Sequence, residues 1–352
     1  MLQSEIKSSF VELGNFLRQF SSENYTKNTS VLHNDLYFEA MADLIALSQS
    51  HNGWFTPENV TFSLKSWAEA LTESNLNTWL EPYSFVEKEK NIGLILAGNI
   101  PLVGFHDLLS VLVAGHKALV KTSTNDQHLL KFLVQYLNTL DQRFSEKITF
   151  VDGKLEGFDA VIATGSNNTA RYFEYYFSSK PHIIRKNRNS IAILTGNESH
   201  EDLVQLGEDI FRYFGLGCRN VSKLFVPKDY NFDAFFKAIF TYQDIIKYEK
   251  YANNYDYNKA VYLMSNYKLL DNGFLTLRKD SSYSSPISSV FYEFYEDIDS
   301  LKNRLQTEHE QIQCIVSDGI TENSILFGQT QQPKLWDYAD NVDTMDFLIH
   351  LK

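Results

Sequence analysis

Cysteine is scarce in this sequence, which has two thiols, Cys218 and Cys314, in 352 residues. Two cysteines cannot build a disulfide framework, and their spacing is not that of a metal site. The sequence therefore predicts a protein of the reducing cytoplasm that holds no metal. A single bridge between the two thiols is the less favoured alternative.

Basic clusters and long apolar runs are missing as well. Lys and Arg total 32 against 44 Asp and Glu, so the formal net charge is −12 at pH 7. Negative charge without a basic block argues against a nucleic-acid partner. Polar residues that include Asn99, His106, Asp107 and His116 interrupt the most apolar region, 92–120, and residues 1–7 lack the pattern of a secretory signal. We expect no stable membrane insertion and no export.

Alternating strand and helix patterns are what the sequence does contain. Helical periodicity dominates residues 1–80, and short apolar runs separated by helical patterns follow from residue 91. This alternation is typical of an α/β fold built on parallel sheets. The predicted strands are 91–97, 117–124, 148–151, 159–163, 183–185, 190–195, 221–227, 288–295 and 312–317. Residues 327–351 are predicted to be mainly loop.

Four short motifs lie at the ends of these patterns. They are Gly98-Asn99-Ile100-Pro101, Lys121-Thr122-Ser123, Thr164-Gly165-Ser166 and Gly217-Cys218. Backbone N–H groups at a Gly-Ser turn that opens a helix suit a phosphate, although such a turn is also an ordinary cap. A thiol between glycines suits an exposed nucleophile, although an unbridged cysteine is more often a buried small hydrophobe.

In this order, the four motifs resemble those of the aldehyde dehydrogenase superfamily, over about residues 90–330. The resemblance implies an aldehyde-dehydrogenase-like fold, with a Rossmann-like parallel-sheet cofactor domain and a smaller α/β catalytic domain. We expect residues 1–188 to hold the N-terminal helices and the nicotinamide-cofactor domain. Residues 189–320 would form the catalytic domain, and 321–352 a C-terminal segment that returns to the cofactor domain.

The same resemblance implies roles for individual residues. Cys218 would attack a carbonyl carbon and carry the acyl group as a thioester. The Asn99 side chain and the Cys218 N–H would stabilise the oxyanion. Lys121 and Ser123 would lie near the adenosine ribose or its phosphate, and Gly165 and Ser166 near the pyrophosphate.

Departures from the superfamily pattern narrow the expected activity. Thr124 replaces a glutamate that holds the ribose hydroxyls, which favours NADPH over NADH because no carboxylate repels a 2′-phosphate. Residues 186–189 and 285–289 replace segments that carry a water-activating glutamate and a second ribose-binding glutamate. An enzyme that exchanges its acyl group with coenzyme A does not need the water-activating base. Together with residues 327–333 and 340–344, these losses resemble the acyl-CoA reductase branch, the LuxC-type fatty acyl-CoA reductase family.

The resemblance thus implies NADPH-dependent reduction of a long-chain acyl-CoA, or another acyl thioester, to an aldehyde through an acyl-cysteine intermediate. Two alternatives stay open: a CoA-acylating aldehyde dehydrogenase acting on a short acyl-CoA with NAD(H), and a catalytically silent scaffold of the same fold. A homo-oligomer and an acyl-transfer partner are both compatible with the sequence.

Other reactive side chains receive plainer interpretations. His106 and His116 are predicted to be packed or capping rather than catalytic, and Cys314 is predicted to be a core residue. Arg185 and Arg188 fit either a coenzyme A phosphate or a solvated turn. The tyrosines between 242 and 257 fit an exposed helix better than an acyl channel.

Overall fold

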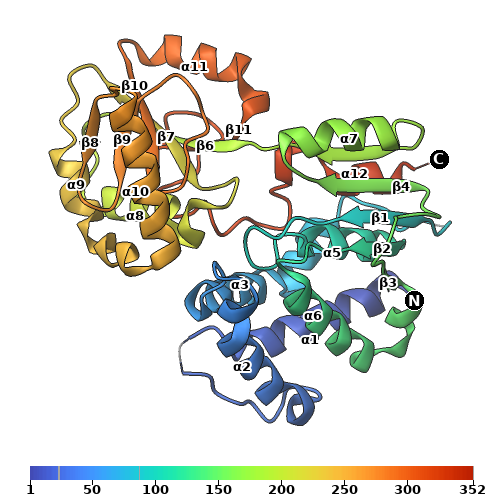
Figure 1. Cartoon of the computed structure of the whole chain (residues 1–352). Coiled ribbons are helices and arrows are strands. Elements are labelled where there is room, and N and C mark those ends of the chain that lie inside the picture. Colours follow the sequence, from blue (N-terminus) through green and yellow to red (C-terminus); the bar gives the residue numbers. More distant parts are fainter. Residues whose placement is uncertain (23, 87, 352) are drawn as a thin grey trace. The chain divides into compact units, whose positions relative to one another are not determined.

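The computed structural model describes residues 1–22, 24–86 and 88–351 and forms two compact units (Figure 1). Unit 1 comprises Met1–Lys186 and Lys334–Lys352, and unit 2 comprises Asn187–Pro333. The C-terminal segment therefore joins unit 1 from Lys334, and residues 321–333 belong to unit 2. No helix among the described residues is long and apolar enough to cross a bilayer.

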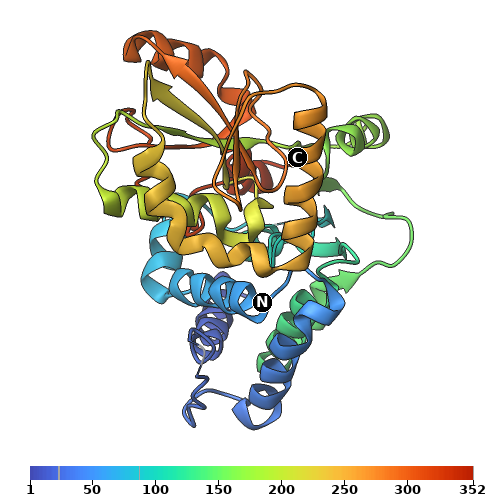
Figure 2. The ribbon, with the colours of Figure 1, turned by 60° about the vertical axis from the view of Figure 1, so that its left-hand side comes forward.

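A layer of four helices opens unit 1: α1 (Gln3–Arg18), α2 (Asn34–His51), α3 (Pro57–Ala70) and α4 (Glu73–Leu80). Their apolar faces bury side chains such as Phe10, Leu64 and Trp79. The Thr56 hydroxyl caps α3 by accepting from the Asn59 N–H, and Pro57 occupies its first turn, where no N–H is needed. Figures 1 and 2 show this layer in blue, on the side of the unit 1 sheet where α6 lies.

The sheet of unit 1 is entirely parallel among its described pairs and has five strands in the order β3-β2-β1-β4-β5. These strands are β1 (Asn91–Ile95), β2 (Lys117–Lys121), β3 (Ile148–Phe150), β4 (Ala160–Thr164) and β5 (His182–Arg185). The same core cluster includes Ile92 and Leu94 of β1 and residues of α5 (Phe105–Ala114), α6 (Gln127–Leu140) and α12 (Thr344–Ile349). On the other face, Val161 and Ala163 pack with α7 (Asn167–Phe177). The helices therefore cover both faces and leave the strand ends for loops.

Unit 2 is a six-stranded sheet in the order β11-β6-β7-β10-β9-β8. Its strands are β6 (Asn189–Ile193), β7 (Val221–Pro227), β8 (Leu269–Asp271), β9 (Thr276–Lys279), β10 (Ser289–Tyr295) and β11 (Ile312–Val316), with β8 antiparallel to β9. Leu224 and Val226 of β7 pack with α8 (His200–Phe211) and α9 (Asp233–Ile239). Phe225 points to the other face, toward α11 (Ile298–Thr307). Successive side chains of β7 point to opposite faces of the sheet, so this one strand contacts the helices on both faces.

Three elements differ from the sequence expectations. The short strands β8 and β9 were not predicted, and the C-terminal segment contains α12, whose Met345 and Leu348 are fully buried.

The tyrosine-rich stretch does form a helix, α10 (Glu249–Met264). The expectation that its tyrosines are exposed is wrong for Tyr251 and Tyr255, which are buried and donate to the Phe274 carbonyl and to Asp271.

Candidate functional site

Three of the predicted motifs lie at the carboxyl edge of the unit 1 sheet. β1 pairs in parallel with both β2 and β4, so the chain leaves all three strands at the same edge. The connection from β1 leads to Asn99, that from β2 to Ser123 and that from β4 to Gly165. The strand order changes direction between β1 and β4, and in open parallel sheets this edge is where ligands bind.

The loop that carries Asn99 is fixed against the loop that follows β2. A Cβ at Gly98 would lie 2.7 Å from the Ser123 Cβ, so only glycine allows this approach. Leu102 adopts a left-handed conformation with φ 58°, which is costly for a branched side chain. The buried Asp126 carboxyl group accepts the Leu102 N–H at 2.7 Å and so stabilises this turn. Asn99 itself is exposed.

The five residues predicted to bind the cofactor have different local partners. Lys121 Nζ donates to the Gly153 carbonyl at 2.8 Å, and Ser123 Oγ accepts the Asn125 N–H at 3.2 Å. Thr124 is exposed in the turn before α6. Ser166 caps α7 by accepting the Thr169 N–H, and Gly165 lies tightly against the side chains of that helix. The structure brings these residues to one sheet edge, where their predicted cofactor role stays a prediction.

In unit 2, the chain between α8 and β7 makes the turn that presents Cys218. Tyr213 and Phe214 have φ values of 54° and 58°, and Gly215 follows at 76°. Two aromatic residues in the left-handed region are strained and persist only where packing holds them. The Phe214 ring stacks on Tyr248 with centroids 4.5 Å apart. Cys218 is exposed, so the alternative of a buried core cysteine is wrong for it, whereas Cys314 is buried as expected.

Side-chain hydrogen bonds hold the backbone on both sides of the thiol. Ser190 Oγ donates to the Cys218 carbonyl at 3.0 Å, and Asn220 Oδ1 accepts the Gly217 N–H at 2.8 Å. The amide nitrogen of Asn220 donates to the carbonyls of Asp209 and Arg212 at the end of α8. Ser190 and Asn220 are both buried, which limits the competition of water for these part-buried bonds.

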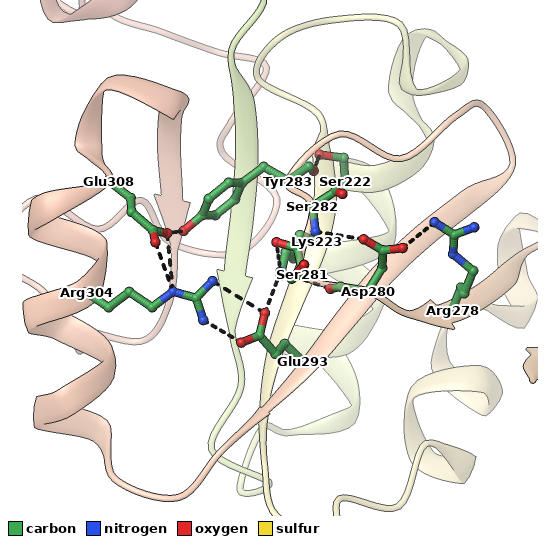
Figure 3. A network of polar contacts seen from close by, with 10 residues as sticks. All are labelled: Ser222, Lys223, Arg278, Asp280, Ser281, Ser282, Tyr283, Glu293, Arg304 and Glu308. Atoms are coloured by element: carbon green, nitrogen blue, oxygen red, sulfur yellow. Dashed lines mark hydrogen bonds and ion pairs between the residues drawn. The ribbon is translucent and has the colours of Figure 1, made fainter. Parts of the chain in front are cut away.

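A buried lysine, Lys223, follows the thiol on β7 and was not anticipated from the sequence. Its ammonium donates to the Asp280 and Ser281 carbonyls at 3.1 and 2.8 Å and to Glu293 at 2.8 Å. Figure 3 shows that Arg304 of α11 faces the same carboxylate. Burial lowers the pKa of Lys223, and Glu293 opposes this effect. Because all three ammonium donors are used, Lys223 joins β7 to β10 and to the segment after β9 rather than acting as a base.

Arg185, His116 and His106 have structural partners. Arg185 is buried, pairs with Asp107 of α5 and donates to Thr344 of α12 at 2.9 Å, so both a solvated turn and a coenzyme A contact are wrong for it. His116 accepts the Lys90 N–H at 3.2 Å and donates to the Leu348 carbonyl at 3.0 Å. His106 Nε2 contacts the Leu335 carbonyl at 2.8 Å. Burial lowers the pKa of both histidines, as expected for packed imidazoles.

The two α/β units, each built on a mainly parallel sheet, define a protein with the aldehyde dehydrogenase fold. Aldehyde dehydrogenase 21 from Physcomitrella patens is similar, with a TM-score of 0.66 and 11% identity over 99% of this chain and 84% of that one. An aldehyde dehydrogenase from Bacillus cereus, solved with NAD+, gives 0.61 and 12% over 90% and 72%. Residues 12–240 match the family described as Acyl-CoA reductase (LuxC), and the chain belongs to this family.

Family membership makes the chain an oxidoreductase that acts on an aldehyde or an acyl-CoA. The matched segment contains Asn99, Cys218 and all five residues predicted to bind the cofactor. None of the curated proteins gives a significant match to this sequence.

Proposed function

We propose that this protein reduces a long-chain acyl-CoA to an aldehyde with NADPH, using Cys218 as the nucleophile. The observation that carries the proposal is the exposed thiol of Cys218, whose backbone is held by Ser190 and Asn220 within the segment that matches the family. Acyl transfer requires a nucleophile that the substrate can reach and that is held in a defined orientation. An exposed thiol on a hydrogen-bonded backbone meets this requirement.

The chemistry at Cys218 proceeds in two stages. The Cys218 thiolate attacks the thioester carbonyl, the bond from that carbon to the coenzyme A sulfur breaks, and coenzyme A leaves as a thiol that takes up the proton Cys218 has lost. When bound, the nicotinamide cofactor supplies the hydride that reduces the acyl carbon. The bond from that carbon to Sγ then breaks, which releases the aldehyde and restores the thiolate.

Asn99 is proposed to donate a hydrogen bond to the oxyanion that forms during both stages. Gly98, Leu102 and Asp126 hold its loop, so the donor group is carried on a fixed backbone. Removal of one such donor typically slows turnover by about a hundredfold or more. We therefore expect Asn99→Ala to acylate Cys218 about a hundredfold more slowly, while a Thr124 variant acylates at the wild-type rate.

The residues at the unit 1 sheet edge fit a nicotinamide dinucleotide that carries a 2′-phosphate. The Gly165-Ser166 turn at the start of α7 lies at the strand-order reversal where such ligands bind. Thr124 is exposed and uncharged where the superfamily has a glutamate, so nothing at that position repels the phosphate. Lys121 and Ser123 would hold the adenosine side, and Gly165 and Ser166 the pyrophosphate.

Intact-protein mass spectrometry tests the proposal directly. After mixing with hexadecanoyl-CoA, the wild-type chain should gain one hexadecanoyl group that maps to Cys218, and NADPH should remove it with release of the aldehyde. Cys218→Ala should gain no mass, and Cys314→Ala, which removes the buried thiol, should behave like the wild type.

Each alternative gives a different result in the same experiment. A silent scaffold would bind the cofactor without any mass gain on Cys218. A CoA-acylating aldehyde dehydrogenase would be acylated faster by acetyl-CoA than by hexadecanoyl-CoA, and NADH would discharge it better than NADPH. Mass gain on the Cys218→Ala variant would reject Cys218 as the nucleophile.

A further inference from the structure

A turn far along the chain, residues 328–330, is held by a single carboxylate of α8. Asp209 Oδ2 accepts the Gly328 N–H at 2.7 Å. Asp209 Oδ1 accepts both the Thr330 N–H at 3.0 Å and the Thr330 hydroxyl at 2.8 Å. Asp209 and Thr330 are fully buried, so no solvent replaces these bonds if one is lost.

The local backbone shows that this turn is specified by sequence. Gly328 has a φ of 79°, a left-handed conformation that favours glycine, and Phe327 packs into the core of unit 2. Gln331 Nε2 donates to the Thr330 hydroxyl at 3.1 Å, which orients its proton toward Asp209. The turn therefore has one well-defined arrangement, set by the carboxylate.

The 328–330 turn is also hydrogen-bonded to Arg219, the residue that follows Cys218. Arg219 Nε donates to the Thr330 carbonyl at 2.7 Å. Asp209 also meets the thiol loop from the other direction, because its backbone carbonyl accepts from the Asn220 amide, whose oxygen in turn accepts the Gly217 N–H. The residues on both sides of Cys218 thus connect to Asp209, by its carbonyl on one path and its carboxylate on the other.

We propose that Asp209 is a positioning residue for Cys218, which acts through the 328–330 turn and Arg219. Without the carboxylate, the Thr330 carbonyl loses its fixed place, and Arg219 loses the acceptor that orients it. Ser190 and Asn220 would then hold the Cys218 backbone without the third attachment. Small displacements of a nucleophile are costly, because the reacting atoms must meet at a defined distance and angle.

The test measures the loop and the chemistry separately. In Asp209→Asn, one oxygen becomes an NH2 group that cannot accept an N–H. We expect amide hydrogen exchange in the peptide covering 215–221 to speed up about tenfold or more, while the core strand β10 stays protected. The consequence for catalysis rests on the proposed function: kcat for acyl-CoA reduction should fall about tenfold to a hundredfold, with KM nearly unchanged.

Two milder variants and a matched control keep the test decisive if Asp209→Asn folds poorly. Thr330→Val removes one hydroxyl donor and should show the same two effects, each about threefold. Thr330→Ser keeps the hydroxyl and should restore wild-type behaviour. Asp202→Asn is the control, because Asp202 is on the same helix but its described partners are at Ser199.

The outcomes separate the two proposals. Unchanged exchange at 215–221 in both Asp209→Asn and Thr330→Val overturns the positioning role, whatever the enzyme's substrate is. The same role is rejected if Asp202→Asn or Thr330→Ser reproduces the effect. Faster exchange in Asp209→Asn, together with a wild-type protein that hexadecanoyl-CoA never acylates, would support the link from Asp209 to the loop and reject the acyl-CoA reductase activity.

Discussion

Two buried aspartates, one in each unit, hold the loops on which the proposed chemistry depends, and they do so with different numbers of donors. Asp126 accepts one N–H, that of Leu102, and no described residue donates to its buried Oδ1. Asp209 accepts three donors from the 328–330 turn, and both of its oxygens are used. Each acid stabilises a loop that contains a left-handed residue, Leu102 in unit 1 and Gly328 in unit 2.

The comparison shows how hydrogen bonding offsets burial. Burial raises the pKa of Asp126 to about 8, and the single N–H donor opposes this rise. Burial also raises the pKa of Asp209, but three donors favour the ionised form and the pKa reaches only about 6. The carboxyl group of Asp209, in the unit that carries Cys218, is therefore mostly ionised at neutral pH. That of Asp126, in the unit that carries Asn99, is mostly protonated.

The largest effect that separates the two acids is the cost of removing each one. Asp209→Ala leaves three buried donors without an acceptor, so we expect it to lower the free energy of unfolding by about 3 kcal/mol at pH 7. Asp126→Ala leaves one such donor and should cost about 1 kcal/mol. Equilibrium urea unfolding measures both values. Equal costs for the two variants would show that the number of donors does not determine the contribution.

Much of the fold could be predicted from short, mainly apolar runs. Such runs placed β1, β2, β4 and β7 because a parallel strand covered on both faces is apolar along its length. The Gly-Asn, Gly-Ser and Gly-Cys motifs were noticeable because they interrupt that pattern directly after a strand or helix. The sequence therefore indicates the loops that carry the predicted site residues, whose roles stay predictions.

Contacts between distant polar residues could not be predicted in this way. Asp126 and Asp209 look like ordinary helix residues, and Lys223 looks like an error in a buried strand, because their partners lie elsewhere in the sequence. Tyr251 and Tyr255 were misjudged because a tyrosine ring can be buried while its hydroxyl finds an acceptor. β8 and β9 were missed because three or four residues carry too little periodicity.

A second effect distinguishes the acids by pH, and for each pH unit it is smaller than the cost of removing Asp209. A carboxyl group whose folded pKa is raised stabilises the fold at low pH, and this contribution is lost as pH rises from its ordinary value near 4 to the folded value. Relative to the non-titrating Asp126→Asn, the wild type should lose up to about 1.4 kcal/mol per pH unit from about pH 4 to about pH 8. Relative to Asp209→Asn, the loss should end near pH 6.

Urea-unfolding midpoints at pH 5, 6, 7 and 8 for the wild type and both variants would check these ranges. The double variant should show both losses removed, since the two acids lie in different units. If the difference between wild type and Asp126→Asn stays constant between pH 6 and 8, Asp126 is not the more strongly perturbed acid.

The smallest effect concerns cofactor binding. A change at Thr124 should alter the binding of NADPH without altering the acylation of Cys218. Thr124→Glu places a carboxylate at the exposed turn before α6, where it would repel a 2′-phosphate. We expect KM for NADPH to rise about tenfold, equivalent to about 1.4 kcal/mol, with KM for NADH little changed. Thr124→Gln has the same length without the charge and should keep the wild-type preference.

Acylation of Cys218 by hexadecanoyl-CoA should proceed at the wild-type rate in both variants, because no cofactor takes part in that stage. An equal rise for both cofactors, or the same rise in Thr124→Gln, would mean that the side chain's size rather than its charge affects binding at this edge of the sheet.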